Sequence, residues 1–240
     1  MKRCIVFCAG EAGPLPSGFC IGPEELVIAC DAGYRSAREA GVLPHLLIGD
    51  FDSLGEQLPE GIETLRFPVE KDDTDGMLAL REGLRRGFRR FVLFFALGGR
   101  LDHTIANLQS LNFLARQGAR GVLVEEHYSV TSILNGEIRF AAASRGMLSV
   151  FAQGGEARGV YLEGLKYPQH GFTLRDDYPM GVSNEFTGVP ARVAVTACCW
   201  WRGRGRPWWK GYDGYCFPMS HTRLPLTNDR ASSILYSGKG

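Results

Sequence analysis

The hydrophobic pattern of this 240-residue chain changes character near residue 128. Before that point, short apolar runs of strand length alternate with stretches of helical periodicity. The pattern predicts strands over residues 4–8, 26–30, 46–48, 91–97 and 121–124, and helices over 34–40, 75–86 and 102–117. Strands that alternate with helices are typical of an α/β fold with a mainly parallel sheet. We therefore expect an α/β domain over residues 1–127.

After residue 128 the chain consists of short alternating apolar and polar runs that are broken by glycines. Strands are expected over residues 136–140, 147–151, 159–162 and 192–195. Such runs favour antiparallel pairing. The sequence therefore predicts an all-β, sandwich-like C-terminal domain over residues 128–196, followed by an anomalous tail over 197–240.

The helix expected over residues 102–117 has an apolar face. Leucine and isoleucine recur at spacings of three and four, and Gly118 follows as a typical helix end. We expect this face to pack against the sheet through Leu101, Ile105, Leu108, Leu111 and Leu114.

Composition and charge narrow the class of protein. The chain is 45% hydrophobic and 22% charged, with a formal net charge of +1. This balance is ordinary for a globular protein. A net charge this small gives no electrostatic field that would attract nucleic acid or an anionic membrane. The apolar run over residues 4–8 is too short for a signal peptide, and no run approaches a membrane span of roughly 20 residues. We expect a cytoplasmic protein with neither nucleic acid nor membrane as a partner.

The seven cysteines form no Cys-x-x-Cys pair, and most lie in apolar, strand-like runs. An odd number without such spacing indicates neither a disulfide framework nor a zinc site. We expect buried or incidental thiols.

Three clusters of polar residues lie where apolar runs give way to turns, at residues 49–53, 71–75 and 98–103. Ligands of open α/β sheets bind beyond the carboxyl ends of the strands, so these turns are expected to converge. Mg²⁺ takes one or two carboxylates together with phosphate oxygens. Two like charges as close as Asp50 and Asp52 are costly after a strand unless a cation neutralises them. The clusters therefore indicate a magnesium and polyphosphate site.

The third cluster has features of a phosphate-binding loop. Gly98 and Gly99 let the backbone approach a phosphate, and the helix that begins near Asp102 directs free N–H groups toward an anion. Arg100 adds a planar, permanently charged donor. An alternative stays open, because Asp102 and Asp75 could serve only as helix caps. Asp31 could likewise only shape a turn.

Five stretches, in order and at the expected spacing over residues 1–196, resemble the bacterial thiamine pyrophosphokinases. They are residues 30–33 (CDAG), 44–53 (PHLLIGDFDS), 71–75 (KDDTD), 98–104 with Asn107 (GGRLDHT and N), and 183–185 (SNE). The resemblance implies Mg²⁺-dependent transfer of a pyrophosphoryl group from ATP to the hydroxyl of thiamine, giving thiamine diphosphate and AMP. Catalytic roles would then belong to Asp50, Asp52, Asp75, Arg100 and Asp102.

The resemblance also implies the binding residues. Metal ions would be held by Asp50, Asp52 and Asp75, and the nucleotide side would be lined by Asp31, Gly33, Lys71, Asp72, Thr74, Gly98, Gly99, Arg100, Asp102, His103 and Asn107. Ser183 and Asn184 would contact the aminopyrimidine of thiamine, although the residues alone would fit a plain turn. The second domain of one subunit would face the first domain of its partner, so a homodimer with shared active sites is expected.

The tail has an unusual composition. All four tryptophans lie at positions 200, 201, 208 and 209, among several arginines. Such a mixture can stack on single-stranded nucleic acid. Another hypothesis is a shifted reading frame. One set of codons that can encode residues 197–201 (ACCWW), when preceded by a G and read one base earlier, gives Gly-Leu-Leu-Leu-Val, a typical closing strand of the family. A genuine extension is the alternative.

Two further functions compete with pyrophosphate transfer. The run over residues 46–53 could be the strand and Asp-x-Asp turn of an aspartyl-phosphate phosphatase with Asp50 as nucleophile. The chain could also bind thiamine or a nucleotide without catalysis. Release of AMP that depends on thiamine would distinguish pyrophosphate transfer from both.

Overall fold

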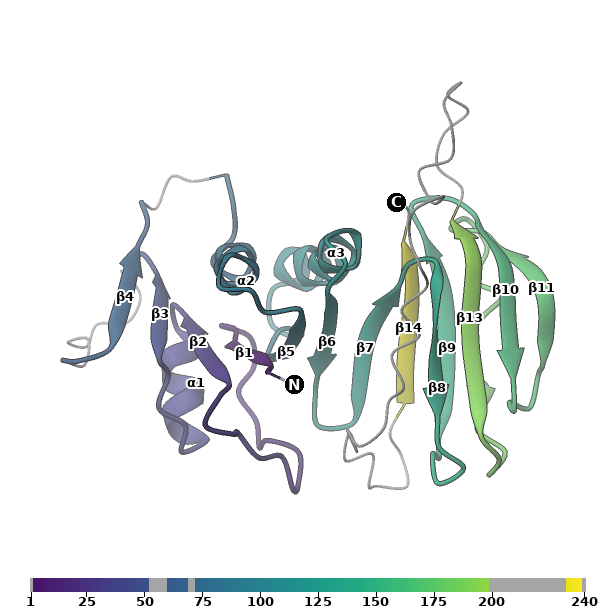
Figure 1. The fold of residues 1–240 in the computed structure, drawn as a ribbon, viewed down its shortest axis with the longest axis horizontal. Helices are drawn as coiled ribbons and strands as arrows, with labels where there is room; N and C mark the ends of the chain where they lie inside the picture. The colour runs from purple at the N-terminus through teal and green to yellow at the C-terminus, as the bar shows by residue number, and fades with distance from the viewer. Residues whose placement is uncertain (1, 52–59, 69–71, 199–231, 239–240) are drawn as a thin grey trace. The chain divides into compact units, whose positions relative to one another are not determined.

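The computed structural model describes residues 2–51, 60–68, 72–198 and 232–238, with the backbone alone for 197–198 and 232–238. The chain divides into two compact units, Met1–Thr131 and Ser132–Gly240 (Figure 1). Most of the predicted tail, with its four tryptophans, lies outside the described residues, as do the predicted site residues Asp52 and Lys71.

A mainly parallel sheet forms the first unit, in the strand order β7-β6-β5-β1-β2-β3-β4. All neighbours pair in parallel except β7, which runs antiparallel to β6. The strands are β1 (Cys4–Phe7), β2 (Leu26–Cys30), β3 (Leu46–Gly49), β4 (Glu63–Arg66), β5 (Arg90–Phe94), β6 (Arg120–Val124) and β7 (Tyr128–Ile133). The predicted parallel strands are therefore present.

Three helices connect these strands in the described part of the unit: α1 (Gly33–Glu39), α2 (Asp75–Arg85) and α3 (Leu101–Arg116). α1 leads from β2 to β3, toward the β4 edge of the sheet. α2 leads from β4 back across the sheet to β5, and α3 continues in that direction from β5 to β6. Because such crossovers are right-handed, α1 covers one face and α2 and α3 cover the other (Figure 1). No described helix is long and apolar enough to cross a membrane.

Strands β1, β2 and β3 contain only buried residues, which is why their sequences are continuous apolar runs. Ile5, Phe7, Leu47 and Phe94 belong to one core cluster beneath α1. Cys4, Cys8 and Cys30 are buried free thiols, and burial raises the pKa of Cys4 and Cys8 to about 12. The prediction of buried thiols is confirmed for these three, whereas Cys20 is exposed.

The second unit contains an antiparallel sheet in the order β11-β10-β13-β8. Its remaining strands pair around β9, with β12 antiparallel and β14 parallel to it. The bounds are β8 (Gly136–Phe140), β9 (Met147–Gln153), β10 (Ala157–Glu163), β11 (Gln169–Leu174), β12 (Asn184–Glu185), β13 (Ala191–Cys198) and β14 (Ser232–Gly238). Antiparallel pairing is present as predicted, but β14 departs from it.

Two predictions about the first unit are wrong. The strand expected over residues 91–97 ends at Phe94, because Phe95 takes a φ of 54° that a strand cannot continue. The apolar face of α3 is buried only in its second half. Leu111 and Leu114 are inaccessible, whereas Leu101 is 73% and Ile105 47% exposed. The first turns of α3 therefore present apolar side chains that the described residues of this unit do not cover.

Candidate functional site

The carboxyl edge of the parallel sheet carries most of the predicted site residues that the structure describes. Asp31 follows β2, Asp50 follows β3, and the segment over 95–100 follows β5. Asp75 begins α2, and Asn107 lies two turns into α3. Since neighbouring parallel strands end at the same edge, the fold brings these groups together from separate parts of the sequence.

Backbone contacts fix the position of Asp31. Its N–H donates to the carbonyl oxygen of Ile48 at 2.9 Å, and its own carbonyl accepts from the N–H of Tyr34 at 3.1 Å. A Cβ on Gly49 would lie 3.2 Å from the Asp31 Cα, so the end of β3 passes against this residue. Asp31 therefore shapes the turn into α1 and at the same time lies against Gly49, the residue that precedes Asp50.

Gly33 must be glycine for steric reasons. A Cβ at this position would lie 2.2 Å from the carbonyl oxygen of Phe7. The first turn of α1 consequently packs directly on the end of β1. This close approach gives Gly33 a structural role at the edge where the nucleotide was predicted to bind.

The segment after β3 turns sharply. Phe51 has a φ of 63° and is 8% exposed, and the guanidinium of Arg66 lies 5.6 Å from its ring centroid. The buried ring anchors the chain directly after Asp50. Asp50 is thereby held at the sheet edge, although its predicted metal-binding partner Asp52 lies outside the described residues.

Thr74, rather than Asp75, caps α2. The hydroxyl oxygen of Thr74 accepts from the N–H of Met77 at 3.2 Å, and Asp75 is the first residue of the helix. The alternative that Asp75 serves only as an N-cap is therefore wrong. The backbone carbonyl of Asp75 accepts from the Cys30 thiol at 3.5 Å, which ties the start of α2 to the end of β2. The preceding Asp72 is exposed.

The start of α3 has a different arrangement from the expected cap. Arg100 occupies the N-cap position without a side-chain cap hydrogen bond, so the alternative that Asp102 caps the helix is wrong. Asp102 instead accepts from the guanidinium of Arg100 at 2.6 Å and from the N–H of His103 at 3.0 Å. The Arg100 guanidinium lowers the pKa of the Asp102 carboxyl. Both side chains are exposed, which leaves Arg100 accessible to an anionic ligand.

The loop between β5 and α3, residues 95–100, has an unusual backbone. Phe95, Gly98 and Gly99 have φ values of 54°, 78° and 61°. Asn107 of α3 donates from its side-chain amide to the carbonyl oxygen of Ala96 at 2.6 Å. Its Oδ1 would lie 3.4 Å from a Cβ on Gly76, so Asn107 also reaches the start of α2. The two helix starts and the glycine loop thus form one contiguous region.

Sequence reasoning missed Glu125, which directly follows β6 at the same edge. Its Oε1 accepts from the N–H of Leu97 at 3.2 Å. Burial raises the pKa of this carboxyl. A carboxylate placed directly after a parallel strand is the signal that could have identified it.

In the second unit, Ser183 and Asn184 have different environments. Ser183 takes a φ of 61°, and its N–H donates to the Ser149 hydroxyl at 3.0 Å. Asn184 is 4% exposed, and its amide both accepts from the N–H of Tyr167 at 2.9 Å and donates to the Tyr167 carbonyl at 2.8 Å. The turn is therefore built around the Asn184 side chain, while Ser183 lies at its surface.

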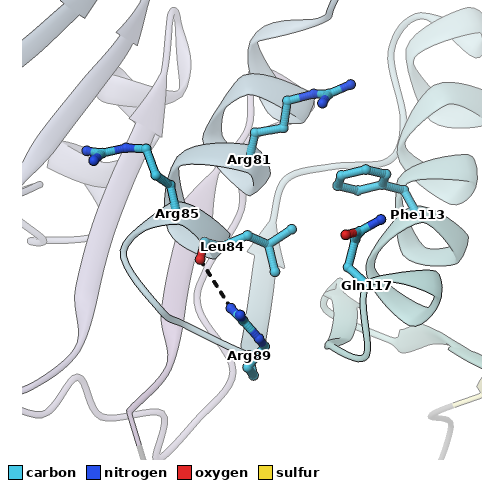
Figure 2. Close-up of a pocket in the computed structure, with 6 residues that line it drawn as sticks. All are labelled: Arg81, Leu84, Arg85, Arg89, Phe113 and Gln117. Atoms are coloured by element: carbon cyan, nitrogen blue, oxygen red, sulfur yellow. Dashed lines mark hydrogen bonds between the residues drawn. The ribbon is translucent and has the colours of Figure 1, made fainter.

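A pocket of about 380 Å³ lies between α2 and α3 (Figure 2). Its lining comes mainly from the last turns of both helices and consists of Arg81, Leu84, Arg85, Arg89, Phe113 and Gln117. Figure 2 shows that none of the predicted site residues is among them.

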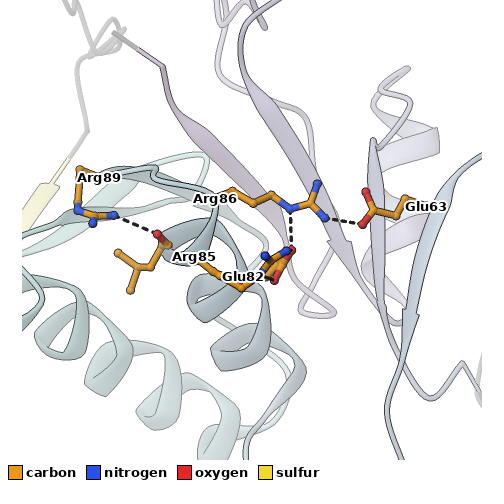
Figure 3. Close-up of polar contacts among 6 residues, drawn as sticks. Glu63, Glu82, Arg85, Arg86 and Arg89 are labelled. Carbon is orange, nitrogen blue, oxygen red and sulfur yellow. Dashed lines mark hydrogen bonds and ion pairs between the residues drawn. The ribbon is translucent and has the colours of Figure 1, made fainter.

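The arginines of this pocket already interact with groups of the fold. Arg81 pairs with Asp73 at 2.9 Å, and Arg89 donates to the carbonyl oxygen of Leu84 at 3.1 Å. Arg85 pairs with Glu82 at 2.7 Å, and Arg86 links that carboxylate to Glu63 (Figure 3). Cations at a helix C-terminus also complement its dipole. These contacts account for the basic residues structurally.

Two of the three predicted metal ligands, Asp50 and Asp75, belong to the described residues. Asp50 and Asp75 offer carboxylate oxygens at the sheet edge, which is the ligand type that Mg²⁺ prefers. Among the described residues, no three His, Cys, Asp or Glu side chains form a group that could hold a metal ion. The third predicted ligand, Asp52, belongs to the segment over 52–59 that the structure does not describe.

Comparison with known proteins gives one consistent family. Residues 21–123 match the model of the thiamin pyrophosphokinase catalytic domain. The chain is 28% identical over 193 residues to the thiamine pyrophosphokinase of Bacillus subtilis (strain 168), covering 77% of this chain and 90% of that protein. Most of the site residues described above fall within the matched region.

Solved structures agree with this similarity. The crystal structure of the Bacillus subtilis thiamine pyrophosphokinase superimposes with a TM-score of 0.71 at 23% identity, over 82% of this chain and 94% of that chain. The corresponding enzyme of Geobacillus thermodenitrificans gives 0.65 at 26% identity, over 82% and 93%. The thiamin pyrophosphokinase of Candida albicans shares the fold at 14% identity with a TM-score of 0.61, over 81% and 86%.

Proposed function

We infer that this chain, a member of the thiamine pyrophosphokinase family, transfers pyrophosphate from ATP to the hydroxyl of thiamine and releases AMP. The observation that carries the inference is the convergence of Asp31, Asp50, Asp75 and the glycine loop at one sheet edge, within the matched region. We further place the protein in the cytoplasm.

The nucleotide binds along this edge in our proposal. Gly98 and Gly99 bring backbone to the phosphates, and Arg100 supplies a bidentate cation. In the free protein Arg100 is bound to Asp102, so phosphate binding exchanges one anionic partner for another. The remaining nucleotide contacts are assigned to Asp31, Gly33, Lys71, Asp72, Thr74, His103 and Asn107.

Asp50, Asp52 and Asp75 would hold Mg²⁺, which supplies charge neutralisation on the transferred phosphates when it is bound. The protein contributes position more than covalent chemistry, because phosphoryl transfer depends mainly on alignment and electrostatic stabilisation. Asp75 or Asp52 would also orient the thiamine hydroxyl or accept its proton. A well-placed base of this kind contributes about 10²–10⁴-fold to the rate.

Thiamine is assigned to the second unit at Ser183 and Asn184. Ser183 offers the direct contact, and the buried Asn184 holds the turn. Exposed apolar side chains support a homodimer in which two chains share each site. Met180 and Val182 precede Ser183 and are 54% and 46% exposed, and Leu101 adjoins the glycine loop with 73% exposure. Burial of such side chains favours association.

An assay for AMP with ATP, Mg²⁺ and thiamine tests the proposed function. AMP should accumulate only when thiamine is present. A phosphoaspartate trapped on Asp50, with no thiamine-dependent AMP, would instead identify a phosphatase, and tight binding without AMP would identify a binding protein. A variant that ends at Cys198, the last residue of β13, tests in parallel whether the tail affects activity.

A further inference from the structure

Glu125 is in direct contact with the glycine loop from a neighbouring strand. β5 and β6 pair in register up to Phe94 and Val124, so Glu125 emerges beside the first loop residue. Its Oε1 accepts a hydrogen bond from the backbone N–H of Leu97 at 3.2 Å, and the N–H of the adjacent Ala96 also acts to lower the pKa of this carboxyl. Ala96 and Leu97 are 2% and 5% exposed, so water has little access to replace the bond from Leu97.

The two amides immediately precede the glycines that were assigned to phosphate binding. Gly98 and Gly99 have positive φ values and are conformationally permissive, so their own backbone does little to fix the course of the loop. The carbonyl side of the same stretch is held by other groups. Asn107 donates to the Ala96 carbonyl at 2.6 Å, and the N–H of Gly10 donates to the Phe95 carbonyl at 2.8 Å. On the amide side, Glu125 accepts the hydrogen bond from the Leu97 N–H.

We propose that Glu125 is a positioning residue that fixes the glycine loop for the phosphates of ATP, an inference that rests on the proposed function. The carboxylate acts through the backbone and does not touch substrate. Its contribution is preorganisation, because a loop already held in its binding geometry loses less conformational entropy when the ligand arrives. The expected consequence of losing Glu125 is therefore weaker ATP binding, with little effect on the affinity for thiamine.

Three substitutions distinguish a positioning role of Glu125 from a general contribution to stability. The charge of Glu125 acts to raise the pKa values of Cys8 and Tyr128, and Glu11 acts to raise that of Glu125. Glu11 also lies against Gly98, 3.2 Å from where a Cβ would be. Glu125→Gln keeps the size and one acceptor oxygen but removes the second acceptor. Glu125→Ala removes both. Glu126→Gln is a matched control, because Glu126 is the adjacent residue and is 61% exposed.

The experiment measures the KM values for ATP and for thiamine, together with amide hydrogen exchange over residues 95–100, in the full-length chain. Glu125→Ala should raise the KM for ATP about tenfold or more, which corresponds to losing hydrogen bonds to a charged group. Glu125→Gln should have a smaller effect in the same direction. Both should leave the KM for thiamine within about twofold and accelerate exchange in the loop, whereas Glu126→Gln should match the wild type.

Two results would overturn the proposal. One is an unchanged KM for ATP in Glu125→Ala with unchanged loop exchange. The other is an equal rise in both KM values with a lowered unfolding midpoint in Glu125→Gln, which would mean general destabilisation. If the wild type releases no thiamine-dependent AMP, the proposed function fails instead, and hydrogen exchange still reports whether Glu125 holds the loop.

Discussion

The side-chain amide of Asn107 and the carbonyl oxygen of Ala96 form a hydrogen bond of 2.6 Å that joins α3 to the loop after β5. Ala96 is 2% exposed, so its carbonyl has little access to water if this donor is removed. We predict that Asn107→Ala lowers the free energy of unfolding by about 1–3 kcal/mol, the usual cost of an unpaired buried acceptor. The KM for ATP should rise as well. Urea denaturation and steady-state kinetics measure the two effects.

Gln109→Ala is the control for this prediction, because Gln109 lies on the same helix and is exposed. It should change neither quantity appreciably, since surface substitutions usually stay within about 0.5 kcal/mol. If Asn107→Ala were as stable as Gln109→Ala, the bond to Ala96 would not contribute to the fold.

A second prediction concerns the contact between α1 and β1. Gly33→Ala places a Cβ 2.2 Å from the Phe7 carbonyl oxygen, which lies in backbone and cannot rotate away. We expect a loss of about 1–3 kcal/mol or more in the free energy of unfolding, as for other overpacked sites. Gly13→Ala is the matched control, because a Cβ there meets nothing within 4 Å. Thermal unfolding of both variants should separate them clearly, and equal midpoints would contradict the close approach.

The elements that sequence reasoning located well are those whose pattern is set by burial. β1, β2 and β3 are continuous apolar runs because both of their faces are covered, and α2 was expected over 75–86 and is Asp75–Arg85. β4 was missed because it is a short strand of polar composition, ETLR, with its ends exposed. Edge strands lack the apolar signature that identifies central ones.

The sequence predicted which polar residues would gather at the site, but it did not predict the individual hydrogen bonds and helix caps that they form. The position of Asp31, Asp50 and Asp75 at one edge follows from parallel strand order. The roles of Thr74 and Arg100 at the helix starts could not be inferred, since each depends on backbone geometry at one residue. The exposure of Leu101 and Ile105 also escaped sequence reasoning, because periodicity indicates an apolar face but not what covers it.

A third prediction addresses the proposed metal ligands. Asp52→Ala and Asp75→Ala should each abolish thiamine-dependent AMP release while leaving the fold intact, because each removes a carboxylate that is assigned to the metal. Circular dichroism checks the fold, and the AMP assay across a Mg²⁺ titration checks activity. Asp73→Asn is the control, since Asp73 pairs with Arg81 and has no assigned ligand role. Near-normal activity in either alanine variant would remove that residue from the metal site.

A fourth prediction separates Asn184 from Ser183. Asn184→Ala breaks two hydrogen bonds to the Tyr167 backbone at a site that is 4% exposed, so it should lower the free energy of unfolding by about 1–3 kcal/mol. Ser183→Ala leaves the backbone bond to Ser149 in place and should raise the KM for thiamine without this loss. Denaturation together with thiamine kinetics distinguishes the two roles. Equal stability of both variants would contradict a structural role for Asn184.

The last prediction concerns pH and the carboxylate of Glu82, which binds Arg85 at 2.7 Å and Arg86 at 2.6 Å (Figure 3). The hydrogen bond from Arg85 is the main cause that lowers the pKa of Glu82 from 4.5 to about 2. Because the pKa is depressed in the folded state, the associated stability is fully present above about pH 4.5 and is lost as the pH falls through about 2. We expect Glu82→Gln to lower the free energy of unfolding at pH 7 by about 1–3 kcal/mol.

The test compares wild type and Glu82→Gln by urea denaturation between pH 7 and pH 2. The difference in unfolding free energy should shrink below about pH 4.5 and nearly vanish near pH 2, because the wild-type carboxyl is then becoming neutral as well. Glu156→Gln is the control, since Glu156 and its partner Arg158 are 38% and 57% exposed. An exposed pair contributes at most about 1 kcal/mol, so this variant should differ little from the wild type at any pH. A difference for Glu82→Gln that stays constant down to pH 2 would show that Glu82 stabilises the protein by packing rather than by charge.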